Sequence, residues 1–174
     1  MRNTIVAVAL VAACGGRPPA SVDAFKPWPK MTALDAVSNT TDGLIVITNS
    51  EDACADLAAD RQPANLQKIV IRVGTRTGGL LSAPQLPGTY AVVQSVPYAA
   101  GNGNMALVEY GATDADCVAN DRIIAGVGTV TLTELGPEGY SGTFDVRAGY
   151  AEVTGSFTAR HCSALTMKQP SRCR

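Results

Sequence analysis

The sequence contains few of the residues from which common catalytic and metal sites are built. Its one histidine, His161, is the only side chain suited to general base chemistry near neutral pH. It has no Cys-x-x-Cys spacing, which argues against a structural zinc site. Acidic and basic residues are interspersed and leave a net charge of -1, so we expect no nucleic-acid partner. We also expect no metal and no cofactor.

Long amphipathic periods are scarce too, whereas Gly, Thr, Val and Ala are plentiful. This composition favours strands and turns over helices. The chain has 174 residues, of which 46% are hydrophobic, so it is long and apolar enough for one domain with a real core.

The C-terminal third, Gly126 to Cys162, contains three consecutive runs with a period of two, which is typical of half-buried strands. Val130 and Leu132 share one face of the first run. The inward positions of the next two runs are Tyr140, Gly142, Phe144 and Val146, followed by Ala151, Val153, Gly155, Phe157 and Ala159. These runs predict an antiparallel meander.

The last two runs of the meander form a predicted hairpin. If Ala148 and Gly149 are its two-residue loop, Arg147 pairs with Tyr150. In this register the two inward glycines of the hairpin face each other. They would leave a gap in the inner layer that a large side chain has to fill.

The middle of the chain supplies the remaining elements. Residues 33–48 predict a hairpin whose second strand, residues 44–47, is apolar on both faces, as a strand covered on each side would be. A short helix should follow, capped by Asn49 or Ser50 and ending near Arg61. Further strands are predicted over 66–73, 89–94 and 105–110. The expected fold is mainly β, an antiparallel sandwich or barrel of about eight strands with one short helix after the second strand.

The N-terminus is typical of a targeting signal. Residues 1–13 give a basic start, a short apolar core and small residues before Cys14. The tetrapeptide Val-Ala-Ala-Cys resembles the lipobox of bacterial lipoproteins, which implies acylation of Cys14, with an ordinary secretory signal as the alternative. Gly15 then implies, by the Gram-negative sorting rule, an outer membrane lipoprotein that faces the periplasm or the surface. A Pro/Gly-rich tether is expected over 14–31, and a single β-domain over 32–174.

Four cysteines lie in the predicted domain. In an oxidising compartment we expect two disulfides among Cys54, Cys117, Cys162 and Cys173. Three connectivities are possible, and we favour Cys54–Cys117 with Cys162–Cys173, because the second bond would fix a tail that has little else to bury. A zinc site that uses His161 beside Cys162 is the rival interpretation.

Two groups of acidic residues would meet if Cys54 and Cys117 were bonded. They are Glu51, Asp52 and Asp56, and then Asp114, Asp116 and Asp121. Oxygen-rich loops can hold calcium, but these residues lack the ordered ligand spacing of known calcium loops. We therefore interpret them as a solvated helix face and a polar loop, with a calcium site as the alternative.

The outward positions of the meander are rich in hydroxyl side chains. They are Thr129, Thr131, Ser141, Thr143, Thr154, Ser156 and Thr158. A carbohydrate- or protein-binding module, or an inhibitor, could use this face. Threonine is also favoured on strands by its β-propensity alone, which is the structural explanation.

The series GTVTLT, GTFD and GSFTA, followed after two further residues by Cys162, resembles a group of uncharacterised predicted lipoproteins of bacterial genomes. The resemblance covers most of residues 43–162 and implies no activity. We expect a lipid-anchored, non-enzymatic β-domain of the cell envelope with a structural or binding role. The alternatives are a binding module that uses the hydroxyl face and an enzyme that uses His161.

Overall fold

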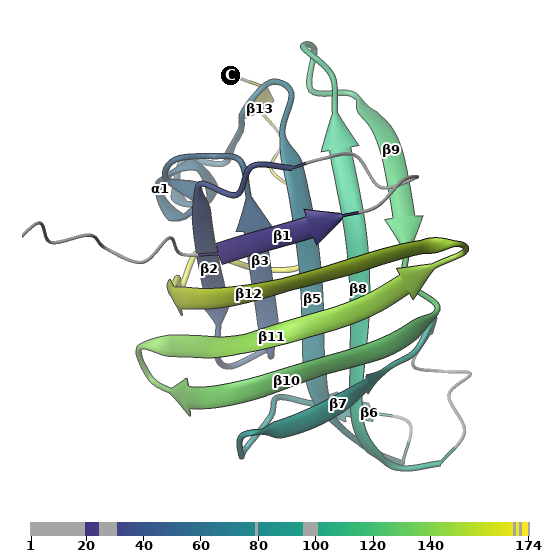
Figure 1. The fold of residues 1–174 in the computed structure, drawn as a ribbon. Coiled ribbons are helices and arrows are strands. Elements are labelled where there is room, and N and C mark those ends of the chain that lie inside the picture. The colour runs from purple at the N-terminus through teal and green to yellow at the C-terminus, as the bar shows by residue number, and fades with distance from the viewer. Residues whose placement is uncertain are drawn as a thin grey trace, which may run out of the picture.

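The structure, a computed structural model, describes residues 20–24, 31–78, 80–95, 101–168, 170, 172 and 173. Its strands form two halves that cross each other in Figure 1. The first half contains β2 (Asp35–Asn39), β3 (Leu44–Thr48), β5 (Gln67–Thr77) and β8 (Gly103–Thr113), with β6 (Leu80–Ser82) and β9 (Ala119–Ile124) attached. The second half contains β7 (Gly88–Val92), β10 (Val127–Gly136), β11 (Gly139–Ala148) and β12 (Ala151–His161), with β1 (Ala20–Ala24) paired to β12. A separate small sheet pairs β4 (Arg61–Gln62) with β13 (Arg172–Cys173), and α1 (Ala53–Ala58) is the one helix in the described residues.

Eight of these strands close into a barrel. Hydrogen-bonded neighbours follow in the order β5, β3, β2, β12, β11, β10, β7, β8 and back to β5. The junctions between the halves, β12 with β2 and β7 with β8, are parallel, whereas the pairs within each half are antiparallel. The predicted fold class is confirmed, with the short helix directly after the β2–β3 hairpin. The pairing is therefore mixed rather than purely antiparallel, because the two junctions where the halves meet are parallel.

Alternate side chains of every barrel strand point inward and form one large core. Ile45 and Ile47 on β3, and Ile69 and Ile71 on β5, are completely buried in it. Tyr90 and Tyr110 are the largest fully buried side chains. An eight-stranded barrel is just wide enough for side chains to fill its interior. The cavities described below lie outside this core, over the outer face of β3, β5 and β8.

The predicted inward face of the meander is confirmed, but the predicted register of its hairpin is wrong by two residues. The loop starts at Gly149, whose φ of 62° is left-handed and suits glycine. Gly142 consequently lies opposite Phe157, and Gly155 lies opposite Phe144, instead of one glycine facing the other. A shift of two residues keeps every side chain on its face. Each glycine is therefore paired with an aromatic ring that occupies the space beside it.

Strand β1 lies inside the stretch for which the sequence predicts a tether. It pairs with β12 from Ala20 opposite Phe157 to Ala24 opposite Val153. Ala20 is buried in the main core, and Val22 packs against that core. The sheet therefore includes residues that come before the predicted domain boundary at residue 32.

Substitution of Gly142 tests which face of β11 points into the core. A β-carbon at Gly142 would lie 2.2 Å from the carbonyl oxygen of Thr131 and 3.0 Å from Cζ of Phe157, so a side chain there has to displace backbone. We expect Gly142→Val to lower the free energy of unfolding by roughly 1–3 kcal/mol, as overpacking does. Thr143→Val, at the next position on the exposed outer face, should change it by less than about 0.5 kcal/mol. Equal losses in urea unfolding of the two variants would mean that the faces are assigned incorrectly.

Candidate functional site: a covered groove on the outer face of the barrel

The outer face of β3 and β5 is apolar, like the inner face. Leu44 and Val46 point outward from β3, and Val70, directly opposite Val46, points outward from β5. They form a second hydrophobic cluster with α1 and with residues that follow β12, including Leu165. The prediction that residues 44–47 are covered on both faces is confirmed. A second layer thus covers this part of the barrel.

The first part of this layer is α1, which is shorter than the predicted helix. Asp52 is its N-cap and accepts a hydrogen bond from the backbone N–H of Ala55 at 3.3 Å. Asn49 does not cap the helix, because its side-chain oxygen accepts the backbone N–H of Gln67 at 2.8 Å. Leu57 packs into the second cluster from the helix. The segment between β3 and α1 is therefore held to the start of β5 before the helix begins.

The second part of the layer is a segment that we call the strap, residues 162–168, 170, 172 and 173. A disulfide joins Cys162, at its start, to Cys54 on α1, and another joins Cys173, near its end, to Cys117 between β8 and β9. The two expected disulfides are present, but the favoured pairing is wrong. The parallel pairing of β12 with β2 brings Cys162 beside α1, with 5.7 Å between the Cα atoms of the first bond.

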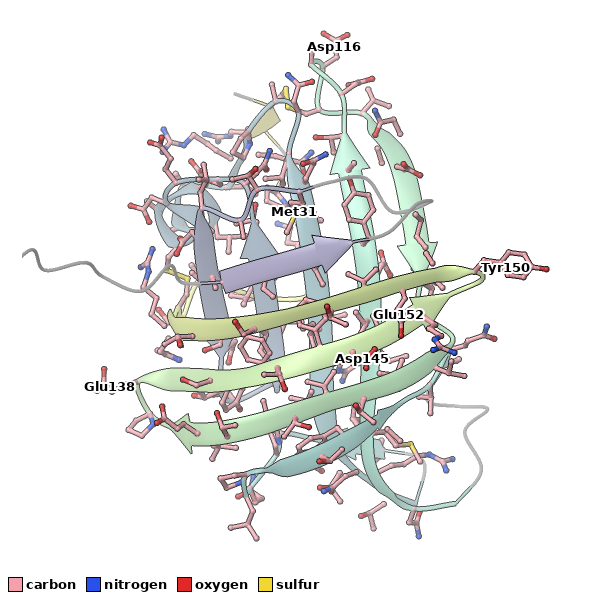
Figure 2. The ribbon with its side chains drawn as sticks, in the orientation of Figure 1. Met31, Asp116, Glu138, Asp145, Tyr150 and Glu152 are labelled. Carbon is pink, nitrogen blue, oxygen red and sulfur yellow. A yellow bond between two sulfur atoms is a disulfide. The ribbon has the colours of Figure 1, made fainter. Side chains whose placement is uncertain are left out.

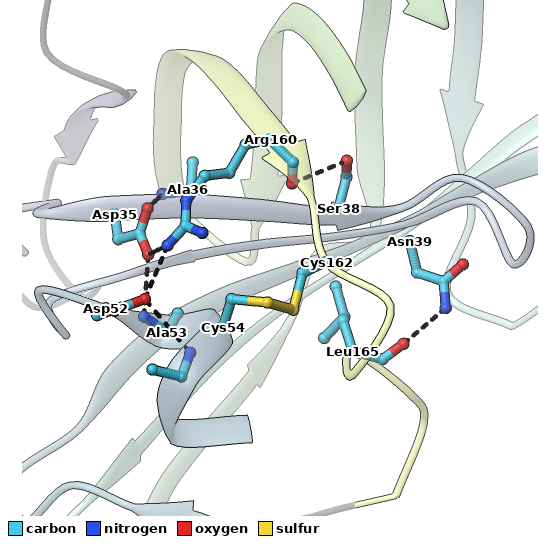
Figure 3. The surroundings of a disulfide bond; sticks show 11 residues. Asp35, Ala36, Ser38, Asn39, Asp52, Ala53, Cys54, Arg160, Cys162 and Leu165 are labelled. Carbon is cyan, nitrogen blue, oxygen red and sulfur yellow. Dashed lines mark hydrogen bonds and ion pairs between the residues drawn. A yellow bond between two sulfur atoms is a disulfide. The ribbon is translucent and has the colours of Figure 1, made fainter. Parts of the chain in front are cut away.

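Beside the first disulfide, Arg160 joins three elements (Figure 3). Its Nη2 donates to Oδ2 of Asp35 at 3.0 Å and to Oδ1 of Asp52 at 2.9 Å. Asp35 is buried and also accepts the backbone N–H of Ala53 at 2.9 Å. The hydrogen bond from Arg160 lowers the pKa of Asp52 and raises the pKa of Arg160. The end of β12, the start of β2 and the N-terminus of α1 are thereby held together by charged groups.

Hydrogen bonds attach the strap to the barrel at more points. The backbone N–H of Cys162 donates to the carbonyl of Ser38 at 2.7 Å. The buried side chain of Asn39 donates to the carbonyl of Leu165, also at 2.7 Å (Figure 3). Near the other end, β13 pairs with β4, with Arg172 opposite Arg61. The strap is therefore attached near its start and near its end by hydrogen bonds in addition to the two disulfides.

Two adjoining cavities lie between the barrel and its covering layer, and we call them together the outer-face groove. The first has a volume of about 250 Å³, and the second, nearer to β9 and the second disulfide, about 570 Å³. Both are lined by Lys68, Glu109 and Arg122. The apolar lining of the first cavity includes Leu44, Val46, Leu57, Val70 and Leu165. The groove thus has an apolar end under α1 and a charged middle.

Positive charge is in excess around the first cavity. Its charged lining consists of Arg61, Lys68, Arg122, Lys168, Asp56 and Glu109. Two of these form a two-pronged ion pair, in which Nε and Nη2 of Arg122 each donate to a carboxylate oxygen of Glu109 at 2.8 Å. Arg61 lies 3.6 Å from the buried carboxylate of Asp56. Glu109 and Asp56, the two acidic residues of this lining, are thus each paired with an arginine.

Lys68 lies where the apolar end meets the charged middle. It is half-buried on the outer face of β5, directly opposite Gly111 of β8. A β-carbon at Gly111 would lie 3.5 Å from Cε of Lys68, so the lysine stem extends over the position that has no side chain. Burial lowers the pKa of the Lys68 ammonium, and the negative charge of Glu109 raises it in part. A negative group placed here would stabilise the charged ammonium.

The seven hydroxyl residues predicted as a binding face do lie together on the outer face of β10, β11 and β12. Thr131, Thr143 and Ser156 are direct cross-strand neighbours, and Thr89 of β7 extends this row. The hydroxyls of Thr89 and Thr131 are 3.3 Å apart. This face belongs to the half of the barrel that contains β7 and not to the half that forms the groove. The two surfaces are therefore separate candidates.

The other candidate residues lie apart. The two acidic groups are not joined by a disulfide, since the partner of Cys117 is Cys173, and Asp116 lies at the tip of the β8–β9 connection (Figure 2). His161 is exposed at the end of β12, with its Nδ1 3.5 Å from the hydroxyl of Thr40. Within the described part of the chain, no three His, Cys, Asp or Glu side chains gather closely enough to hold a metal ion.

Comparison of the chain with protein-family models, with curated proteins and with solved structures finds no match. Among the residues that the structure describes, no helix has the length and apolar character needed to cross a membrane.

The sequence pattern alone does not locate the groove. One signal was present, because the apolar outer positions of residues 44–47 indicate a covering layer. The location of Lys68 on the same outer face also follows from the alternation of β5. The position of the strap could not be inferred, because it depends on a disulfide pairing that spacing alone leaves open.

Proposed function

We propose that this protein is a lipid-anchored, non-enzymatic domain of the bacterial cell envelope that binds a small apolar ligand in the outer-face groove. The observation that supports the proposal is that Val46, Leu57 and Val70 belong to the second hydrophobic cluster but remain only partly buried, facing a cavity of about 250 Å³. Apolar side chains around a preformed cavity are typical of small-molecule sites. The two disulfides that hold the strap reduce the conformational entropy that the protein would lose when a ligand enters.

The proposed location in the cell envelope rests on two features. The lipobox-like sequence ends at Cys14 and is followed by Gly15, which favours an outer membrane lipoprotein. Two disulfides are typical of a compartment outside the cytoplasm.

The hydroxyl face of β10, β11 and β12 is the second candidate surface, but the β-propensity of threonine already explains it.

Mass spectrometry of protein extracted from membranes tests the anchor. We expect the N-terminal peptide to begin at Cys14 and to carry a diacylglyceryl group, because the preceding residues resemble a lipobox. Cys14→Ser should release the protein from the membrane fraction. A wild-type N-terminal peptide without acylation would contradict the proposed anchor.

Methyl NMR with 1-octanol tests the groove separately from any charge. The full chain is reconstituted into phosphatidylcholine nanodiscs, so that no detergent competes for the site. We expect saturable shifts of the outward methyl groups of Val46, Leu57 and Val70. The inward methyl groups of Ile45 and Ile71, on the same strands, are the matched control and should not move. Unchanged outward methyl groups, or equal shifts on both faces, would contradict binding in the groove.

A further inference from the structure

The charge around the first cavity differs from that of the whole molecule. The chain has a net charge of -1, but the first cavity is lined by four cationic and two acidic side chains. Each of these two acidic residues interacts with an arginine. Glu109 lies 2.8 Å from Arg122, and Asp56 lies 3.6 Å from Arg61. Local positive charge in a partly apolar cleft favours anionic ligands and disfavours cationic ones.

Lys68 is the cation best placed to meet such a ligand. It neighbours Val70 on the outer face of β5 and Leu66 just before that strand, and all three line the first cavity. Lys168 is exposed at the strap, and the side chain of Arg122 is 68% exposed, so water weakens the interactions of both cations. Lys68, by contrast, is half-buried and lies next to the apolar end of the first cavity, where weaker screening by water strengthens a direct bond to an anion.

The apolar end sets the size of the ligand. Val46, Leu57 and Val70 face the first cavity on one side of Lys68, and Leu165 of the strap lies across it. Taking about 30 Å³ for each water-sized group, a cavity of about 250 Å³ accommodates about eight such groups. An unbranched chain of this length would complete the burial of the three half-buried side chains.

We infer that the outer-face groove binds a medium-chain carboxylate, with its aliphatic chain against Val46, Leu57 and Val70 and its carboxylate on the ammonium of Lys68. The inference rests on the proposed ligand-binding role of the groove and adds the chemical class of the ligand. Binding involves no covalent step. A carboxylate forms a charge-assisted hydrogen bond with the Lys68 ammonium that is stronger than the bond of a neutral head group, and this difference is the source of the specificity for an anion.

Titration calorimetry with octanoate and 1-octanol tests the inference, again with the full chain in phosphatidylcholine nanodiscs and with empty nanodiscs as the background. Because only octanoate can bond the ammonium, we expect it to bind at least about tenfold more tightly than 1-octanol. Lys68→Met keeps an unbranched side chain of similar length without the charge. It should weaken octanoate binding by about tenfold or more and leave 1-octanol binding unchanged.

Two further variants serve as controls. Arg147→Met also removes one positive charge, but Arg147 is exposed on β11 in an ion pair with Glu152, so octanoate binding should be unchanged. Val70→Phe places a ring in the first cavity and should abolish binding of both octyl compounds. Equal affinity for octanoate and 1-octanol would overturn the carboxylate inference and leave the ligand-binding role intact. Binding of neither compound by the wild-type protein would overturn both, and an equal effect of Arg147→Met would reduce the role of Lys68 to general charge.

Discussion

The covering layer of this barrel depends on two disulfides that fix the strap at both ends. Cys54–Cys162 attaches its start to α1, and Cys117–Cys173 attaches its end to the connection between β8 and β9. Each bond closes a long loop, with sequence separations of 108 and 56 residues, so each is expected to contribute about 2–4 kcal/mol through the unfolded state. Beside the first disulfide, the ion pairs of Arg160 with Asp35 and Asp52 hold the end of β12 to the start of β2 and to the N-terminus of α1. Without these attachments the apolar outer face of β3 would be exposed to water.

The two faces of β3 and β5 differ in how completely they are buried. The inward residues of β3 and β5, such as Ile45 and Ile71, are completely buried and specify the core. The outward residues Val46 and Val70 are only partly buried, because the strap and α1 enclose a cavity above them instead of packing closely. In the described residues buried side chains line the barrel interior, and the ligand site that we propose is therefore the groove on its outer face.

Patterns of period two predicted the inward faces correctly, because alternation is a local property of each strand. Even the hairpin register, wrong by two residues at Gly142, preserved the faces, since a strand repeats every two residues. The parallel contact of β12 with β2 could not be predicted, because it forms between segments that are distant in sequence. That contact places Cys162 beside α1, so the disulfide pairing and the groove were both missed for the same reason.

Digestion of the unreduced full chain, followed by mass spectrometry of the cross-linked peptides, tests the fixed strap most directly. The structure predicts peptides that join Cys54 to Cys162 and Cys117 to Cys173, since these bonds hold the covering layer over the groove. Peptides that join Cys54 to Cys117 and Cys162 to Cys173 would contradict it. In that pairing the tail would close on itself, and nothing would fix the strap across the outer face of the barrel.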